Sequence, residues 1–286
     1  MSSTLSSPSR RTLLAAGAAG AATALLGAGP AAAADLKPTA AVRVLTYNIH
    51  HGASGAEVFD LERVAEVIEA VRPDIVGLQE VDRHWSARSQ WLDLPEWFSE
   101  RLGMRYVYGA NLDLDPLVPG DPRRQYGTAI LTPWPVKSSS NTLLPKLGTH
   151  EQRGLLQAEI EVNGSRVRFA NTHLQHNDAF ERQLQAARIR ELLGDDADRT
   201  ILVGDLNAVP GTPEMLTMTG FLKDAWTEAG SGDGYTHDSE HPHARIDYVM
   251  HSSDVRAESA AVIMSDPLTS DHLPVAADLR VDKGRF

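Results

Sequence analysis

Apolar residues in this chain gather into short runs, and most of these runs turn polar where they end. The segments at residues 74–79 and 200–204 are almost continuously apolar, which is typical of strands that are covered on both faces. The strands expected from such runs lie near residues 42–48, 74–79, 127–132, 154–162, 166–173, 200–205, 246–251, 257–264 and 274–281. These are more strands than one compact sheet usually holds, so we expect two packed sheets.

Apolar residues spaced three and four apart predict a helix after the first strand. They lie on one helical face at Leu61, Val64, Ala65, Ile68 and Val71. Asp60 is a suitable N-cap, and Pro73 prevents the helix from continuing. A weaker pattern predicts a short helix near residues 94–102, before Gly103.

A longer helix is predicted from about residue 178 to residue 193. Asp178 and Glu181 resemble a capping box at its start, and Gly194 follows its end. The apolar residues that share one face of this helix are Phe180, Leu184 and Ala187. Because the predicted helices lie between strands, and Asn163-Gly164 predicts an antiparallel hairpin, we expect an α/β fold with mixed sheets covered by helices.

The first 34 residues have the composition of an export signal. Arg10 and Arg11 precede a stretch rich in Ala, Gly and Leu that ends in small residues at Ala34. This order is typical of signal peptides, and adjacent arginines are typical of twin-arginine export. A membrane anchor is the alternative, which the weak hydrophobicity of Ala and Gly disfavours. We therefore expect residues 1–34 to engage the twin-arginine export machinery, residues 35–286 to form one domain, and the protein to be secreted, or associated with the cell envelope if the signal is retained.

The acidic charge of the mature chain limits the classes of partner that it can bind. The full sequence of 286 residues has 27 basic and 38 acidic side chains. Removal of residues 1–34 takes away two arginines and no acid, so 25 basic side chains oppose 38 acidic ones and the formal charge is −13. Such a surface argues against tight non-specific binding of nucleic acid, but it does not exclude a local group of basic residues around the site. Because the chain has no cysteine, disulfides and thiolate zinc sites are excluded.

Residues that bind metals or transfer protons stand at the ends of several predicted strands. They are Asn48, Glu80, His173, Asp205, Asn207, Asp247, Asp271 and His272. An Asp or Asn after one strand usually only forms a turn, but α/β proteins place ligand-binding groups at such strand ends. Oxygen ligands with few imidazoles suit Mg²⁺ or Mn²⁺ better than Zn²⁺. A carboxylate-held Mg²⁺ beside further acids and two histidines is suited to the hydrolysis of a phosphate ester.

The motifs around these residues resemble the endonuclease/exonuclease/phosphatase superfamily. In chain order they are Thr46-Tyr-Asn-Ile-His-His-Gly52, Leu78-Gln-Glu-Val-Asp82, Tyr126-Gly-Thr-Ala-Ile-Leu131, Asn171-Thr-His-Leu174, Gly204-Asp-Leu-Asn-Ala-Val-Pro210, Arg245-Ile-Asp-Tyr248 and Ser270-Asp-His-Leu-Pro274. The resemblance extends from about Ala41 to Leu279. It implies a four-layer αββα sandwich, with two mixed β-sheets face to face and helices outside, and a phosphoesterase that depends on a divalent metal.

The resemblance also implies a metal site. Glu80 would be the principal ligand of Mg²⁺ or Mn²⁺. Asn48 and Asp271 would complete this site or lie beside it.

The other matched residues would handle water and phosphate, again by resemblance. Asp205 would orient or deprotonate the attacking water, and Asn207 would hold that water or the phosphate. His272, steered by Asp247, would hydrogen-bond the phosphoryl group or act as the base. His173 would contact the phosphate or assist the leaving group.

Further histidines make a zinc enzyme the competing interpretation. His50 and His51 follow the first strand, and we expect them to line the mouth of the site or to form its loop. His237, His241 and His243 have ligand-like spacing, but their polar surroundings predict an exposed loop. A zinc amidohydrolase would regain activity with Zn²⁺ alone after chelation. A non-catalytic binding module would lack a ligand or a base, and none is missing.

The expected reaction is the hydrolysis of a P–O bond by in-line attack of water, without a covalent intermediate. A small phosphodiester or lipid-type head group is the first candidate substrate, extracellular nucleic acid the second, and a phosphomonoester such as an inositol phosphate the third. Arg88, Arg124 and Arg153 are candidates for binding a second phosphate or a head group. Trp85, Trp91 and Trp97 are expected to pack a helix onto the sheet, with an aromatic rim for lipid or sugar as the alternative.

Overall fold

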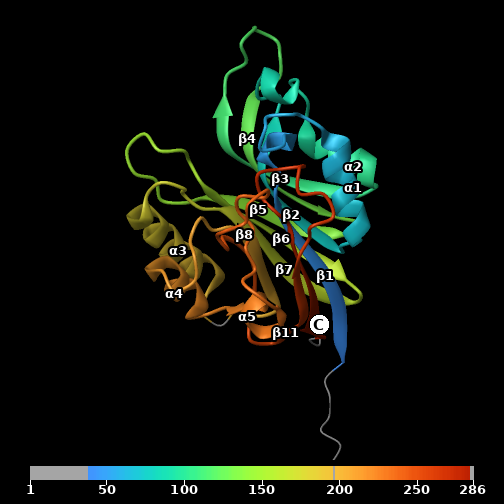
Figure 1. Ribbon diagram of the computed structural model, residues 1–286, viewed down its shortest axis with the longest axis vertical. Coiled ribbons are helices and arrows are strands. Elements are labelled where there is room, and N and C mark those ends of the chain that lie inside the picture. The colour runs from blue at the N-terminus through green and yellow to red at the C-terminus, as the bar shows by residue number, and fades with distance from the viewer. Residues whose placement is uncertain (1–37, 196, 284–286) are drawn as a thin grey trace, which may run out of the picture. The chain divides into compact units, whose positions relative to one another are not determined.

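The computed structural model describes residues 38–195 and 197–283. The predicted export signal, residues 1–34, lies outside this range. Within the described residues, no helix is both long enough and apolar enough to cross a bilayer. The described chain forms two six-stranded sheets with helices on their outer faces (Figure 1).

The first sheet has the strand order β11-β12-β1-β2-β4-β3. Its strands are β1 (Thr39–Asn48), β2 (Ile75–Arg83), β3 (Arg105–Leu114), β4 (Arg124–Thr132), β11 (Val255–Val262) and β12 (Val275–Asp282). β1 and β2 are parallel, and the other neighbouring strands are antiparallel. Because Asn48 is the register partner of Gln79, the polar ends of β1 and β2 lie at the same edge of this sheet.

The second sheet has the strand order β5-β6-β7-β8-β10-β9. Its strands are β5 (Val136–Leu143), β6 (Gly154–Val162), β7 (Ser165–His173), β8 (Thr200–Asp205), β9 (Lys223–Asp224) and β10 (Asp247–His251). The parallel pair of β7 and β8 sets His173 directly beside Asp205. β10 runs antiparallel to β8 and sets Asp247 on the other side of Asp205. Three strands therefore bring three predicted site residues into one row.

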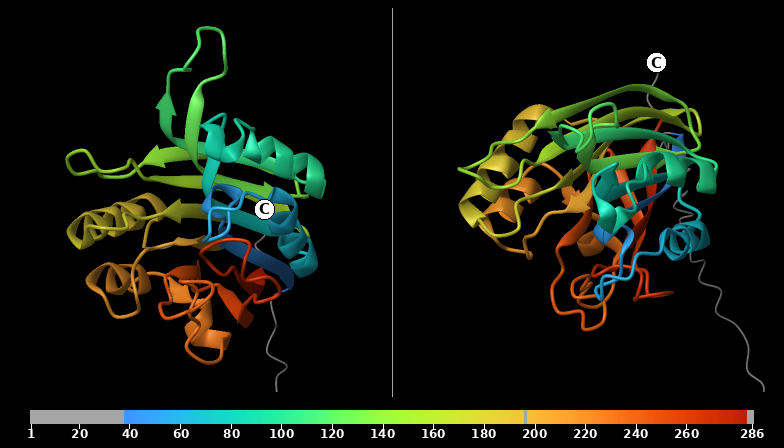
Figure 2. Two further views of the ribbon diagram at one scale, coloured as in Figure 1. Left: turned by 45° about the horizontal axis from the view of Figure 1, so that its top comes forward. Right: turned by 90° about the horizontal axis from the view of Figure 1, so that it is seen from above.

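Helices cover the outer face of each sheet (Figure 2). The helices are α1 (Leu61–Val71), α2 (Leu94–Leu102), α3 (Ala179–Leu193), α4 (Pro213–Thr219) and α5 (Ala225–Ala229), and two short 3₁₀ turns are η1 (His50–Gly52) and η2 (Ala87–Ser89). α1 and α2 share an apolar cluster with β1, β2 and β4. α3 and α4 share another with β7, β8 and β10. The predicted helices at 61–71 and 94–102 are confirmed.

The central core lies between the two sheets. It contains inward-facing residues of both, among them Val44, Phe169 and Val203. A Cβ atom on Gly77 would come within 2.4 Å of the Val203 side chain, so β2 and β8 approach each other closely at this point. Burial on both sheet faces explains the continuously apolar runs at 74–79 and 200–204. The predicted fold class, a four-layer αββα sandwich of two mixed sheets flanked by helices, is confirmed.

The long helix is confirmed, but the apolar face noted in its sequence is not the buried one. Asp178 caps α3 through the backbone N–H of Glu181, as predicted. Phe180 is 61% exposed, whereas the side chains of Glu181 and Gln185 are completely buried. These two polar side chains bind the loops beside the helix, where Glu181 accepts from the backbone N–H of Leu147 and Gln185 from that of Gln175. The polar contacts therefore decide which side of α3 faces inward.

Candidate active site

Asn48, at the end of β1, connects the two sheets. This residue is 1% exposed. Its amide nitrogen donates to Glu80 Oε1 at 3.0 Å and to Asp205 Oδ2 at 3.0 Å. Its Oδ1 accepts from the backbone N–H of His50 at 3.1 Å. Because Glu80 belongs to the first sheet and Asp205 to the second, one carboxamide holds two carboxylates from different sheets in a fixed relation.

Glu80 owes its position to a β-bulge. The register between β2 and β4 shifts between Leu78 and Val81, and Glu80 has a left-handed φ of 58°. In a regular strand, neighbouring side chains alternate between the two faces of the sheet. The bulge breaks this alternation and re-aims one side chain, as bulges beside active sites commonly do. Gln79 stays buried between the sheets, and Glu80 contacts Asn48 at the edge.

Asn171 of β7 binds the backbone at this bulge. Its amide nitrogen donates to the carbonyl oxygens of Leu78 at 2.9 Å and Ala129 at 2.8 Å, and its Oδ1 accepts from Gln79 Nε2 at 2.7 Å. Asn171 is 0% exposed. A side chain of the second sheet therefore satisfies polar groups in the first sheet just before Glu80, which stabilises the irregular backbone there.

Asp205 lies at the centre of the site and is 1% exposed. Its Oδ2, which accepts from Asn48, lies 3.4 Å from His173 Nε2 and 3.6 Å from His272 Nε2. Its Oδ1 accepts from the backbone N–H of Asn207 at 2.9 Å. One carboxylate oxygen thus faces two imidazoles and an amide, while the other closes an Asx turn.

His272 and Asp247 form a buried pair beside Asp205. His272 Nδ1 lies 2.9 Å from Asp247 Oδ2, and both residues are at least nine-tenths buried. Because a carboxylate only accepts, Nδ1 is the donor, and Nε2 is directed toward Asp205. The other oxygen of Asp247, Oδ1, is buried without a hydrogen-bond partner. Asp247 therefore fixes the orientation of the His272 ring.

Burial and neighbouring charges separate the pKa values of these groups. Burial raises the pKa of Asp205 to about 7, and the nearby Asp247 charge adds to this rise while His272 opposes it. Burial lowers the pKa of His272, but Asp247 and Asp205 outweigh it and raise that pKa to about 10. Burial lowers the pKa of His173 well below its usual value. Near neutral pH the site therefore holds one cationic imidazole, one neutral imidazole and one carboxyl close to its titration point.

A protein-family comparison agrees with this geometry. The model of the Endonuclease/Exonuclease/phosphatase family matches residues 45–272, which include every residue described above in this site. The chain belongs to the endonuclease/exonuclease/phosphatase family. It is therefore a member of a family of phosphoester hydrolases. A curated relative, the protein cwh43 of Schizosaccharomyces pombe, is 23% identical over 159 residues. That match takes in 55% of this chain and 15% of the length of that relative.

Solved structures share the fold of this family member. An endonuclease/exonuclease/phosphatase from Beutenbergia cavernae is 25% identical, with a TM-score of 0.72 over 85% of this chain and 72% of that one. A mannosyl-6-phosphatase from Bacteroides thetaiotaomicron is 18% identical, with a TM-score of 0.64 over 83% and 99%. The catalytic domain of human Nocturnin, with a bound sulfate anion, is 22% identical, with a TM-score of 0.62 over 86% and 96%. The last two show the fold alone.

Two further predicted residues of this family member lie at the border of the site. Asn207 has a left-handed φ of 48°, and its amide donates to the carbonyl oxygen of Leu174 at 3.1 Å. The side chain of Asp271 is 32% exposed, and its Oδ1 lies 3.9 Å from His50 Nδ1. Its Oδ1 also accepts from the Ser270 hydroxyl at 3.3 Å. The role of each stays a prediction.

His237 is a site neighbour that the sequence analysis did not identify. Its ring lies 4.8 Å from the ring of His272, and the backbones of the two residues form a bridge. His237, Asp271 and His272 can bring one ligand atom each within 4.8 Å of one another. The expected exposure holds for His241 and His243, whereas His237 is half-buried. The ligand-like spacing of His237, His241 and His243 could have indicated its position near the site, but the polar composition of the loop favoured an exposed loop instead.

The three predicted substrate-binding arginines already have partners. Arg88 forms a bidentate ion pair with the fully buried Asp82, at 2.9 and 2.7 Å. Arg153 is 3% exposed and lies 2.7 Å from Glu151. Arg124 donates to a backbone carbonyl of its own hairpin and lies over the ring of Trp85. Binding of phosphate by Arg88 would require its contacts to be shared, whereas Arg153 Nε is buried without a hydrogen-bond partner among the described residues. The role of all three arginines stays a prediction.

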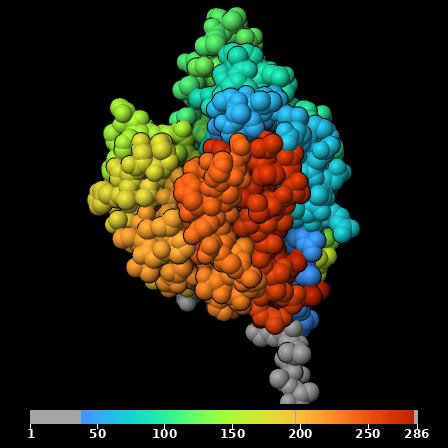
Figure 3. All heavy atoms as spheres, viewed as in Figure 1, coloured from blue at the N-terminus to red at the C-terminus, as the bar shows by residue number. Residues whose placement is uncertain are grey.

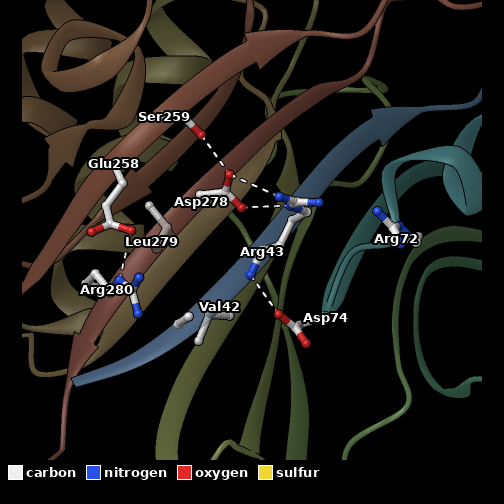
Figure 4. A pocket seen from close by; sticks show the side chains of 10 residues that line it. Val42, Arg43, Arg72, Asp74, Glu258, Ser259, Asp278, Leu279 and Arg280 are labelled. Carbon is white, nitrogen blue, oxygen red and sulfur yellow. Dashed lines mark hydrogen bonds and ion pairs between the residues drawn. The ribbon is translucent and has the colours of Figure 1, made fainter. Parts of the chain in front are cut away.

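A large cavity lies at the opposite end of the first sheet and is separate from the site. It measures about 640 Å³ and is lined by the first half of β1, the residues just before β2, and parts of β11 and β12 (Figure 4). Its charged residues are largely paired with each other, as in the bidentate contact between Arg43 and Asp278. Asn48 and Glu80 stand at the other ends of β1 and β2. This cavity therefore has no part in the chemistry described above.

Proposed function

We propose that this protein is a Mg²⁺- or Mn²⁺-dependent phosphodiesterase that hydrolyses its substrate by direct attack of water. The observation that carries the proposal is the position of Asp205 Oδ2. It lies beside the Nε2 atoms of His173 and His272, while Asn48 connects the same carboxylate to Glu80. One carboxylate is thus available for a metal and a second one for water.

The residues around Glu80 fit a hard divalent cation. Glu80 is only partly buried, and its Oε1 contacts the Asn48 amide rather than a cationic side chain. Oxygen donors of this kind suit Mg²⁺ or Mn²⁺. Glu80 would hold the ion, with Asn48 and Asp271 as its neighbours. The bound ion would polarise a phosphoryl oxygen and offset the charge that develops there.

The protein groups divide the proton transfers between them. Asp205 accepts a proton from water, and the water oxygen bonds to phosphorus as the bond to the leaving oxygen breaks. The cationic His272, oriented by Asp247, donates a hydrogen bond to a phosphoryl oxygen and stabilises the growing negative charge. His173, which stays neutral, offers one N–H to the leaving oxygen, and that oxygen takes its proton from solvent.

The charge balance of the site favours a diester over a monoester. A diester carries a single negative charge, whereas a monoester carries nearly two at neutral pH. The nearby arginines Arg88 and Arg153 are already paired with Asp82 and Glu151. These two cationic side chains are therefore not free to bind the second negative charge of a monoester. The formal charge of −11 for the whole chain also disfavours the binding of nucleic acid. Extracellular nucleic acid is therefore an alternative substrate and not the first one.

An apolar groove supports a substrate with an apolar substituent. The groove measures about 430 Å³ and is lined by Trp91, Leu117 and Val118, which are 42%, 65% and 57% exposed. Arg124 also lines it and lies 5.8 Å from the ring of Trp85. Trp85 in turn contacts Tyr126, whose pKa is raised by burial and by the charge of Glu80. Tyr126 is the register partner of Asp82, two residues after Glu80, so these neighbours lead from the groove toward Glu80, as a lipid-type head group with its chain would require.

The decisive experiment is a substrate panel on the mature protein after metal removal and readdition. We expect a chromogenic phosphodiester to be cleaved faster than the matching monoester, plasmid DNA and RNA, and activity to return with Mg²⁺ or Mn²⁺ but not with Zn²⁺ alone. Asp205→Ala and His272→Ala should each lower kcat by several orders of magnitude while the far-UV circular dichroism stays unchanged. Near-normal rates in either variant would reject the assignment.

A monoesterase is the second candidate. Its support is the fold shared with the mannosyl-6-phosphatase. Faster cleavage of the monoester in the same panel would favour it.

We further propose that the protein is exported through residues 1–34. The support is the Arg10-Arg11 pair ahead of the Ala-rich stretch. Replacement of both arginines by lysine should leave the protein inside the cell. Undiminished secretion would contradict twin-arginine export.

A further inference from the structure

The loop between β1 and α1 brings two consecutive histidines onto one carboxylate. His50 and His51 have left-handed φ values of 42° and 49°, and Glu57 has a φ of 59°. His50 Nε2 lies 3.6 Å from Glu57 Oε1, and His51 Nε2 lies 3.4 Å from Glu57 Oε2. Neighbouring side chains in a regular strand would point to opposite faces. Here the turn directs both imidazoles to the same side.

The hydrogen bonds around His50 leave one of its nitrogen lone pairs facing the Glu57 carboxylate. His50 Nδ1 lies 3.3 Å from the carbonyl oxygen of Ser54, which can only accept, so Nδ1 carries the hydrogen. The Nε2 atom of a neutral His50 then presents a lone pair to the Glu57 carboxylate. Two acceptors that face each other require a proton or a cation between them. A histidine that ligates a metal through one nitrogen commonly donates from the other to a backbone carbonyl in this way.

His51 lies in a buried position beside the same carboxylate. It is 4% exposed, and its Nδ1 has no hydrogen-bond partner. Its other ring nitrogen, Nε2, faces Glu57 Oε2 at 3.4 Å. A buried imidazole needs polar partners for its nitrogens, and a cation bound at Nε2 would supply one of them.

The spacing of the donor atoms matches a tetrahedral metal ion. With bonds of about 2.0–2.2 Å to nitrogen and oxygen, two ligands of a tetrahedral zinc lie roughly 3.3–3.5 Å apart. The two nitrogen-to-oxygen distances in this loop are 3.6 Å to Glu57 Oε1 and 3.4 Å to Glu57 Oε2, so an ion between the rings would face both oxygens of one carboxylate. One ligand atom from each of His50, His51 and Glu57 lies within 4.8 Å of the other two. Small side-chain adjustments would therefore complete the geometry.

We propose that His50, His51 and Glu57 form a second metal site that binds Zn²⁺. Two imidazoles and one carboxylate suit zinc, whereas the oxygen donors around Glu80 suit Mg²⁺ or Mn²⁺. Water would occupy the fourth position. These histidines were expected to form a loop or to line the mouth of the site, and Zn²⁺ would be a ligand of that loop.

The loop lies beside the catalytic residues. Figure 3 shows the blue segment after β1 at the surface, next to the red C-terminal segment. A Cβ on Gly55 would lie 3.7 Å from the Asp271 side chain, so the loop packs against that segment. Zinc would tie the exposed Glu57, at the far end of the loop, to two histidines at the end of β1. It would thereby hold one wall of the site in place.

The test measures metal binding and does not depend on activity. The metal-free Glu80→Gln variant serves as the background, because it weakens the predicted magnesium site. Glu57→Gln is introduced into it, and Glu66→Gln, an exposed glutamate on α1, is the matched control. Zn²⁺ binding is measured by isothermal titration calorimetry, and the site geometry is measured by the visible absorption of Co²⁺.

We expect the background and the Glu66→Gln control to bind one Zn²⁺ and to give the intense absorption of tetrahedral Co²⁺. Glu57→Gln should weaken Zn²⁺ binding at least tenfold and abolish that absorption. Zinc should also raise the Tm of the control more than that of Glu57→Gln, because a ligand that binds only the native state stabilises it. Equal zinc affinity in the two variants, or no zinc bound by the background, would overturn the proposal.

Discussion

Replacement of Asn171 by alanine tests how the second sheet positions Glu80. The side chain of Asn171 makes three buried hydrogen bonds to β2 and β4, of 2.7, 2.8 and 2.9 Å. Alanine removes all three and leaves the backbone of the bulge without its partner from β7. We therefore expect a loss of stability and, because Glu80 follows this backbone, a loss of metal affinity.

The magnitude follows from the bonds that are removed. A buried hydrogen bond contributes about 1 kcal/mol net, so three of them amount to about 3 kcal/mol. A domain of this size loses about 2–4 °C in Tm per kcal/mol, so the Tm should fall by about 6–12 °C. Total stabilities are about 5–15 kcal/mol, and the variant should stay folded. Asn171 holds the backbone before Glu80 rather than Glu80 itself, so the metal affinity should fall by up to the roughly tenfold that is typical when a ligand loses its own hydrogen-bond partner.

Urea unfolding and a magnesium titration of phosphodiesterase activity measure the two effects separately. Asn141→Ala is the matched control, because Asn141 of β5 also bridges the sheets, through Ala110 and Asn111 of β3, at 3.0 and 3.2 Å. We expect both variants to lose stability, and only Asn171→Ala to need more metal for half activity. An unchanged metal requirement in Asn171→Ala would refute the reasoning that the bridged bulge positions Glu80.

Two further predictions concern buried charges. The pKa of His272 is raised from 6.5 to about 10, so its contribution to stability is complete below pH 6.5 and is lost as the pH rises toward 10. In the metal-free protein, Asp247→Asn should lower the pKa of His272 in an NMR titration and reduce the loss of stability between pH 6.5 and 10. An unchanged pKa of His272 in this variant would contradict the pairing of His272 with Asp247. Arg182→Ala should destabilise the fold by roughly 3–5 kcal/mol in urea unfolding, because it leaves Glu214, 1% exposed, without the cation that lies 2.7 Å away. Adding Glu214→Gln should restore part of that stability, and a failure to do so would show that the ion pair is not the cause.

The positions at strand ends could be predicted because two simple patterns coincide there. Buried strands are read from continuous apolar runs, and a polar residue directly after such a run must lie at the edge of the sheet. Asn48 and Asp205 follow this rule, and their hydrogen bond joins two runs that are far apart in sequence. The edge strands β3, β5 and β9 were not predicted, whereas the edge strand β11 was, as the segment 257–264. β5 is mostly exposed and rich in serine, and β3 alternates only weakly, because an edge strand buries less of its surface.

Other features depended on contacts between distant segments. The left-handed φ of Glu80 arises from a register shift against β4, which no local pattern around Glu80 indicates. The inward face of α3 depends on Glu181 and Gln185, whose partners lie in separate loops. His237 contacts His272 through a backbone bridge between a polar loop and the C-terminal segment. Tertiary hydrogen bonding overrides local composition in each case.

The candidate active site and the interface between the sheets are therefore the same structure. Glu80 and Asn48 come from the first sheet, and His173, Asp205 and Asp247 come from the second. A shift of one sheet against the other by the length of a hydrogen bond would separate Asn48 from Asp205, which now lie 3.0 Å apart. Because the core between the sheets is closely packed, such a shift costs stability before it costs catalysis. Substitutions in that core, far from any reacting atom, should consequently lower kcat in proportion to the displacement of Asp205 relative to Glu80.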